Sequence, residues 1–130
     1  RKGICIILSQ QLFYPDPSIS DSAELRERSW SDNDALTLKE TFTTFGADCF
    51  VFYDQTREEI IDKMEKAQQK SNSPLYAWLA VWLLTHKRRY QGSDQILGCN
   101  GVGISISKII NSFTEVKTSA EAIQMPKFFF

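Results

Sequence analysis

Short apolar runs alternate with amphipathic helical segments along this chain, and this alternation restricts its fold more than any other feature. Three runs rich in β-branched or aromatic residues, at 3–9, 47–53 and 75–84, have the length and composition of strands. Strands that alternate with single helices predict right-handed crossovers, a parallel sheet and helices on both of its faces. We therefore expect one α/β domain.

The helical segments carry signals for where they begin and end. Ser31 can cap the first helix, and Gly46 suits the position just past its end. The second helix follows a capping box at 56–59, and Ser105 can cap a third. The apolar faces are predicted to consist of Ala35, Leu38, Phe42 and Phe45 in the first helix, Ile60, Ile61, Met64 and Ala67 in the second, and Ile106, Ile109, Ile110 and Phe113 in the third.

The segments between these elements are expected to be loops. A long loop is predicted at about 10–30, a basic loop at 87–92, and a tight turn or short hairpin in the glycine-containing stretch 96–103, which lacks the spacing of a phosphate-binding loop. A fourth strand begins at Lys127. Because an unpaired apolar strand end favours aggregation, we expect the domain at 1–130 to be incomplete at its C-terminus.

The only histidine, His86, follows the third apolar run. This run is the most apolar segment, so it is predicted to be the most buried strand and the centre of the sheet. In parallel sheets, chemistry collects beyond the carboxyl ends of the strands. His86 could serve there as a general base beside a nucleophile. The alternative, that it fills a polar gap at the rim of the sheet, stays open.

Charge and cysteine usage exclude several classes of protein. A net charge of −1 favours neither nucleic acid nor an anionic membrane as a partner. The longest apolar run has about half the length of a membrane-spanning helix. Cys5, Cys49 and Cys99 are expected to be free thiols of a cytoplasmic protein, and their spacing predicts no metal and no cofactor. Cys99 could pair with His86 as a nucleophile, although a cysteine in a turn more often only packs.

Five segments in a fixed order make the chain similar to the large subunit of the caspases over nearly its whole length. Residues 28–38 resemble the family's arginine loop and D-x-D-A-x-x-L helix start, and residues 42–48 its F-x-x-L-G-F-x turn. Residues 56–60 resemble the T-x-x-E-I helix start. Residues 83–86 are similar to the L-L-S-H strand end, and residues 125–130 to the K-P-K-x-F strand.

The resemblance implies a fold and a chemistry. The fold is the caspase–hemoglobinase three-layer sandwich, with a mainly parallel sheet, of which this chain is the large-subunit portion. The chemistry is thiol-dependent proteolysis after aspartate in apoptosis, in which His86 transfers protons and Arg28 grips the substrate aspartate. The cysteine would lie a few residues beyond Phe130. The implied partners are the small subunit of the same precursor and another caspase or caspase-like protein, as a homo- or heterodimer.

The chain departs from the family at Lys87, where caspases have a glycine whose N–H stabilises the oxyanion. Loss of one such donor costs about a hundredfold or more in rate. We therefore expect a catalytically inactive homologue that regulates apoptotic caspase activity by pairing with an active caspase. The alternative is an active aspartate-specific cysteine endopeptidase, because His86 and Arg28 are both present. A flavodoxin-like or receiver-like domain is disfavoured, because the first strand ends in Ser9-Gln10.

Overall fold

The computed structural model describes residues 2–14, 28, 31–114 and 127–129, and every structural statement below concerns these residues. Their elements are β1 (Lys2–Ser9), α1 (Ser31–Thr44), β2 (Ala47–Tyr53), α2 (Arg57–Ser71), β3 (Tyr76–Leu84), β4 (Lys87–Tyr90), β5 (Ser93–Leu97), β6 (Gly103–Ser105), α3 (Ile106–Thr114) and β7 (Lys127–Phe129). The expected alternation of strands and helices is confirmed. Most of the loop predicted at about 10–30 lies outside the described residues.

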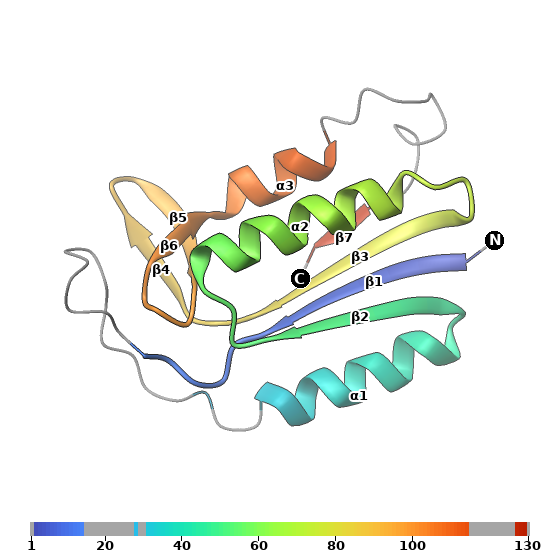
Figure 1. Cartoon of the computed structure of the whole chain (residues 1–130), viewed down its shortest axis with the longest axis horizontal. Helices are drawn as coiled ribbons and strands as arrows, with labels where there is room; N and C mark the ends of the chain where they lie inside the picture. The colour runs from blue at the N-terminus through green and yellow to red at the C-terminus, as the bar shows by residue number, and fades with distance from the viewer. Residues whose placement is uncertain (1, 15–27, 29–30, 115–126, 130) are drawn as a thin grey trace.

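The main sheet is parallel and has the strand order β2-β1-β3-β7. α1 covers one of its faces, and α2 and α3 cover the other (Figure 1). This three-layer arrangement confirms the predicted α/β fold. Because all four strands run in the same direction, their carboxyl ends lie at one edge of the sheet, and ligands of such sheets bind beyond that edge.

Alternating residues of β1 supply the centre of both halves of the core. Ile4, Ile6 and Leu8 face α2 and α3, whereas Cys5 and Ile7 face α1. β1 is therefore the most buried strand, and the expectation that β3 would be is wrong. The reason is that α1 packs against β1 and β2, which leaves side chains of β3 on that face partly exposed. These side chains are Trp78, Trp82 and Leu84.

The helix ends agree with most of the sequence signals. Thr56 Oγ1 accepts a hydrogen bond from the Glu59 amide (3.3 Å) and Glu59 Oε1 accepts one from the Thr56 amide (3.1 Å), so the capping box is formed. Gly46 has the positive φ of 85° that ends α1. Two expectations are wrong. Ser31 is the first helical residue and its hydroxyl bonds elsewhere, while Phe45 lies past the helix end and is 71% exposed.

A second, antiparallel sheet has the order β4-β5-β6. Its first strand, β4, occupies the segment predicted to be a basic loop. Gln91 and Gly92 connect it to β5 with φ of 51° and 77°, the backbone of a tight hairpin turn. The sequence of β4 has no apolar alternation, because its pairing depends on β5 rather than on a buried face. The turn expected within 96–103 is present between β5 and β6.

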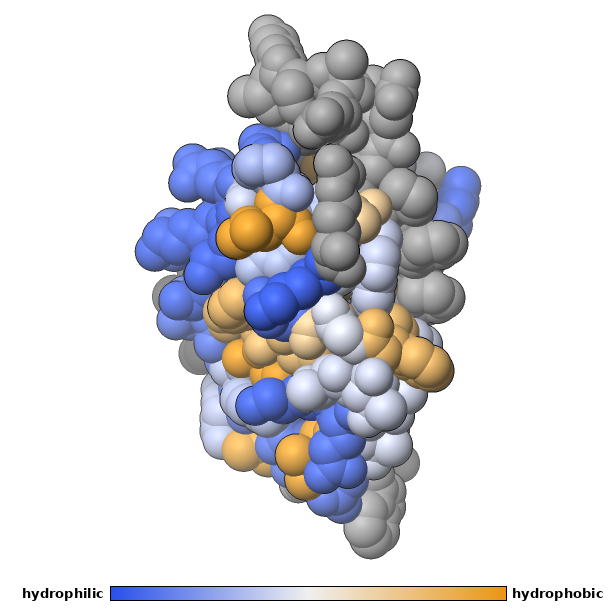
Figure 2. All heavy atoms as spheres, turned by 90° about the vertical axis from the view of Figure 1, so that its right-hand side faces the viewer, coloured by the Kyte–Doolittle hydropathy of each residue, from blue (hydrophilic) through white to orange (hydrophobic). Residues whose placement is uncertain are grey.

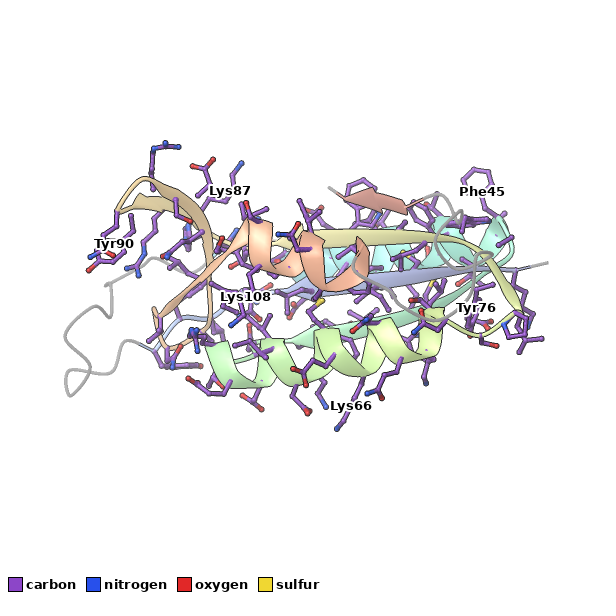
Figure 3. The ribbon with its side chains drawn as sticks, turned by 90° about the horizontal axis from the view of Figure 1, so that it is seen from above. Phe45, Lys66, Tyr76, Lys87, Tyr90 and Lys108 are labelled. Carbon is purple, nitrogen blue, oxygen red and sulfur yellow. The ribbon has the colours of Figure 1, made fainter. Side chains whose placement is uncertain are left out.

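The two ends of the molecule are formed by different elements. The end at which the parallel strands begin carries hydrophobic side chains interspersed among hydrophilic ones (Figure 2). Phe45 and Tyr76 lie toward this end, and Lys87 and Tyr90 lie at the opposite end, on the hairpin (Figure 3). No helix in the described part of the chain is long and apolar enough to cross a membrane.

Candidate active site

The candidate residues lie at the carboxyl edge of the parallel sheet. His86 lies between β3 and β4, Lys87 is the first residue of β4, and Arg28 lies shortly before α1. The edge is at the left of the molecule in Figure 1, where β1, β2 and β3 all end. The topology thus brings residues almost 60 positions apart in the sequence to one edge (86 − 28 = 58).

Gln10, the residue after β1, links the strands at this edge. Its backbone N–H donates to the Leu84 carbonyl (2.8 Å), and its own carbonyl accepts from Arg28 Nη1 (3.3 Å). Its side-chain amide donates to the Gln55 carbonyl (2.6 Å) and accepts from the Gln55 N–H (2.7 Å). Gln10 is fully buried, at 0% exposure. It therefore ties Arg28, the end of β3 and the segment after β2 into one unit.

Arg28 is held from both its backbone and its side chain. Its N–H donates to the Gln11 carbonyl (2.8 Å), and Nη1 also donates to Ser31 Oγ (3.0 Å). Burial lowers the pKa of the Arg28 guanidinium, and the nearby Asp34 carboxylate opposes that shift. A guanidinium has five N–H donors, and among the described residues its bonds to Gln10 and Ser31 both come from Nη1. The N–H groups of Nε and Nη2 lie side by side, so they have the geometry to donate to the two oxygens of one carboxylate.

The Ser31 hydroxyl connects Arg28 to the end of β1. It lies 2.8 Å from Ser9 Oγ, which in turn donates to Asp32 Oδ1 (2.8 Å). Both serines are buried. The beginning of α1 is thereby fixed to the sheet edge by side chains, which holds the backbone next to Arg28 in place.

His86 is half-buried, and its position is fixed from several sides. Its ring lies against that of Phe13, with centroids 4.7 Å apart and an interplanar angle of 51°. Its carbonyl accepts from the Leu97 N–H (3.1 Å), and the Thr85 hydroxyl donates to the Leu97 carbonyl (2.8 Å). These bonds to β5 therefore fix the backbone of His86, which carries the imidazole.

Asp54 secures the segment that carries Phe13. It is one of two non-glycine residues with positive φ in the described chain, at 47°. Its Oδ1 accepts hydrogen bonds from the N–H groups of Gln11 (2.8 Å) and Leu12 (3.1 Å). Further along, the Tyr14 N–H donates to the Cys99 carbonyl (2.6 Å). The segment after β1 is thus bound at successive points along the sheet edge.

The backbone of Lys87 has a geometry that does not require glycine. Its φ is not positive, since only Asp54 and Gln91 have positive φ among the described non-glycine residues. It pairs with Ile96 in the β4–β5 ladder, next to the hydrogen-bonded position at which the Leu97 N–H reaches the His86 carbonyl. Hydrogen-bonded and non-hydrogen-bonded pairs alternate in antiparallel ladders, so the N–H of Lys87 points away from β5.

The side chain of Lys87 is exposed beside a shallow basic cavity. The cavity measures about 280 Å³, and its lining consists of Lys87, Arg88, Arg89, Asp94 and Ile106. Arg89 pairs with Asp94 (3.1 Å), and Arg88 Nε donates to Gln95 Oε1 (3.1 Å). The basic cluster is thus part of an ordered hairpin surface.

Neither Cys5 nor Cys99 has the environment of an activated nucleophile. Burial raises the pKa of the Cys5 thiol to about 12, with the adjacent Cys49 adding to the effect. Burial also raises the pKa of Cys99, with further contributions from Glu59 and Asp54. A thiolate is the reactive form, so both shifts oppose reactivity. In the described residues, no group of three or more histidine, cysteine, aspartate or glutamate side chains could hold a metal ion.

Sequence reasoning missed three residues that build this edge: Gln10, Phe13 and Asp54. Polar residues that directly follow apolar strands could have indicated Gln10 and Asp54, because such residues lie at the carboxyl edge of a parallel sheet. No comparable signal exists for Phe13, whose contact with His86 depends on the path of the segment between them.

Comparison with known proteins identifies the family. The Caspase domain family matches residues 2–130. The chain is 30% identical over 112 residues to Caspase-3 of Felis catus and 32% identical over 111 residues to that of Mesocricetus auratus; in each case the match covers 85% of this chain and 36% of the relative. Caspase-3 of Xenopus laevis is 30% identical over 84 residues, which are 65% of this chain and 27% of the relative. The chain thus spans about a third of the length of these relatives. It belongs to the caspase family.

Proposed function

We propose that this chain contributes half of the active site of an aspartate-specific cysteine endopeptidase. The observation that supports this most is that the backbone of the buried Gln10 links Arg28 to Leu84, two residues before His86. A specificity residue and a proton-transfer residue must keep a fixed separation for a bound peptide to be cleaved.

Arg28 would bind the aspartate side chain of the substrate. Its Nη1 is engaged by Gln10 and Ser31, so Nε and Nη2 would donate in parallel to the two carboxylate oxygens. Partial burial strengthens such a charged pair, because less water competes for it. Lysine at this position could not form the same two-pronged contact.

His86 would transfer protons for a cysteine supplied by another part of the protein, as the family resemblance implies. The thiolate forms a bond to the scissile carbonyl carbon, and the C–N bond breaks as the imidazolium protonates the leaving amine. Water then hydrolyses the thioester, and the imidazole takes up the proton of that water. The Lys87 N–H, directed away from β5, would donate to the oxyanion.

The test uses the full-length protein and a peptide with one aspartate at the cleavage position. We expect cleavage by the natural protein and a loss of about a hundredfold or more in kcat/KM for His86→Ala. Because Lys87 already offers its N–H, Lys87→Gly should change the rate by less than about tenfold. Failure of the natural protein to cleave would overturn the proposal.

A second function is favoured by the side chain of Lys87. Its Cβ and exposed ammonium group stand where the family has glycine, beside the position at which the oxyanion forms. On that ground the protein would be a catalytically inactive regulator of apoptotic caspases that acts by pairing with one of them. Two results would support it: the full-length protein changes the activity of an added active caspase, and Lys87→Gly creates cleavage activity that the natural protein lacks.

A further inference from the structure

A groove between β2 and α2 shares no residue with the candidate active site. It measures about 550 Å³. Its lining includes Phe50, Phe52, Lys63, Lys66, Ala67 and Lys70. We call it the β2–α2 groove. Two phenylalanine rings of the sheet face form its floor, and lysines of α2 form its rim.

Every charged side chain in the lining of the β2–α2 groove is a lysine. Lys63, Lys66 and Lys70 recur at helical spacing, so they share one side of α2. Lys63 lies 5.6 Å from the centre of the Phe52 ring, and Lys70 lies 4.3 Å from that of Phe50. These cation–π contacts hold two ammonium groups over the apolar floor.

Nearby carboxylates neutralise this positive charge only in part. Asp62 pairs with Lys66 at 3.0 Å, but both side chains are more than half exposed, which makes the pair weak. Asp48, at the start of β2, is engaged by Lys2 (3.5 Å) and by the Tyr76 hydroxyl (2.9 Å). Lys66 extends from the outer side of α2 (Figure 3). The rim therefore offers positive charge to a ligand that arrives from outside.

The edge of the sheet beside the groove is formed by β2, whose outer backbone groups pair with none of the described strands. β2 is an edge strand, and among the described strands only β1 pairs with it. The bonds from the Gly3 N–H to the Gly46 carbonyl (3.3 Å) and from the Asp54 N–H to the Ser9 carbonyl (3.0 Å) fix which residues face β1. Because alternate residues of a parallel strand bond to one neighbour, Cys49 and Val51 direct their N–H and C=O groups to the open edge.

We propose that the β2–α2 groove binds an extended acidic peptide segment of a partner protein. The segment would add to β2 as a further strand and bond to the backbone of Cys49 and Val51. Its side chains on the α2 face would place an apolar group against Phe50 and Phe52 and carboxylates against the lysines. A peptide fits better than an anionic lipid, because only a peptide can use the open backbone groups next to the groove. This inference goes beyond the proposed function and does not depend on it.

The test measures fluorescence anisotropy of a labelled peptide, Glu-Thr-Phe-Thr-Glu-Thr, with the full-length protein. In an extended strand its two glutamates and its phenylalanine lie on one face. We expect saturable binding, and the double variant Lys63→Glu and Lys70→Glu should weaken it by about tenfold or more. Lys39→Glu, on the exposed side of α1, is the matched control and should change binding by less than about twofold.

Two further arms separate the parts of the proposal. The same peptide with N-methylated amides should bind about tenfold more weakly or worse, because methylation removes strand-pairing donors. Equal binding by the methylated peptide would overturn strand addition. Absence of saturable binding, or equal binding by the double variant, would overturn the site. Binding to phosphatidylserine vesicles that depends on Lys63 and Lys70, without binding to the peptide, would replace a peptide occupant with a lipid one.

Discussion

The interior of the parallel sheet and its carboxyl edge are held together by different forces. In the interior, Ile4, Ile6, Leu8 and their neighbours pack without direction-specific contacts, and burial of apolar area supplies the stability. At the edge, Gln10, Arg28 and Asp54 are connected by hydrogen bonds between residues far apart in the sequence. The interior should therefore determine how stable the domain is, and the edge should determine what it does.

Truncation of a large core residue should have the largest effect on stability. Phe113 of α3 is fully buried, at 0% exposure, so Phe113→Ala should lower the free energy of unfolding by about 3–5 kcal/mol. Phe45→Ala removes the same ring from a surface position and should cost less than about 0.5 kcal/mol. Urea denaturation of both variants measures the difference. Equal effects would contradict the division between interior and surface.

Loss of Gln10 should disturb the edge more than the interior. Gln10→Ala leaves both backbone groups of Gln55 without their side-chain partner, which should cost about 1–3 kcal/mol in unfolding free energy. Because Gln10 also ties Arg28 to the sheet, activity or partner binding should fall further than the stability change alone explains. The exposed Gln69→Ala is the matched control and should leave stability and cleavage activity nearly unchanged. A variant at Gln10 that loses stability but keeps full function would contradict its role at the edge.

The buried thiol of Cys5 should make stability depend on alkaline pH. Its pKa is raised from an ordinary 9.0 to about 12, so the unfolded chain loses this proton at a lower pH than the folded one. The contribution of Cys5 to stability should therefore be constant below about pH 9 and should fall as pH rises from about 9 toward 12, by about 1 kcal/mol per pH unit. Cys5→Ala should flatten this part of the profile. An unchanged slope in the variant would contradict the assignment to Cys5.

The division between interior and edge also explains what could be predicted from the sequence. The alternating strands and helices, the capping box at Thr56 and the glycine at Gly46 are local patterns, and the structure confirms them. The strand β4 was missed because its pairing comes from β5 rather than from its own pattern. Burial of β3 was overestimated because apolar composition does not indicate which strands α1 covers.

The candidate site was predictable only in part for the same reason. His86 and Arg28 could be singled out from motifs. The position of Gln10 after β1 indicates the sheet edge, but not that its backbone links Arg28 to Leu84. Whether Lys87 can stand where the family has glycine depends on its backbone angles, which a single sequence does not provide. The direction of the Lys87 N–H, away from β5, supports the proposed activity, and it follows from the register of the β4–β5 ladder.

The most direct test of the central claim compares cleavage after aspartate and after asparagine. The full-length protein and its Arg28→Gln variant are each given two peptides that differ only in this residue. The claim that Arg28 and His86 form half of an aspartate-specific site predicts strong preference for aspartate in the natural protein. Arg28→Gln should reduce that preference by about a hundredfold, because two charged hydrogen bonds are lost. Equal cleavage of both peptides by the natural protein, or cleavage of neither, would contradict the claim.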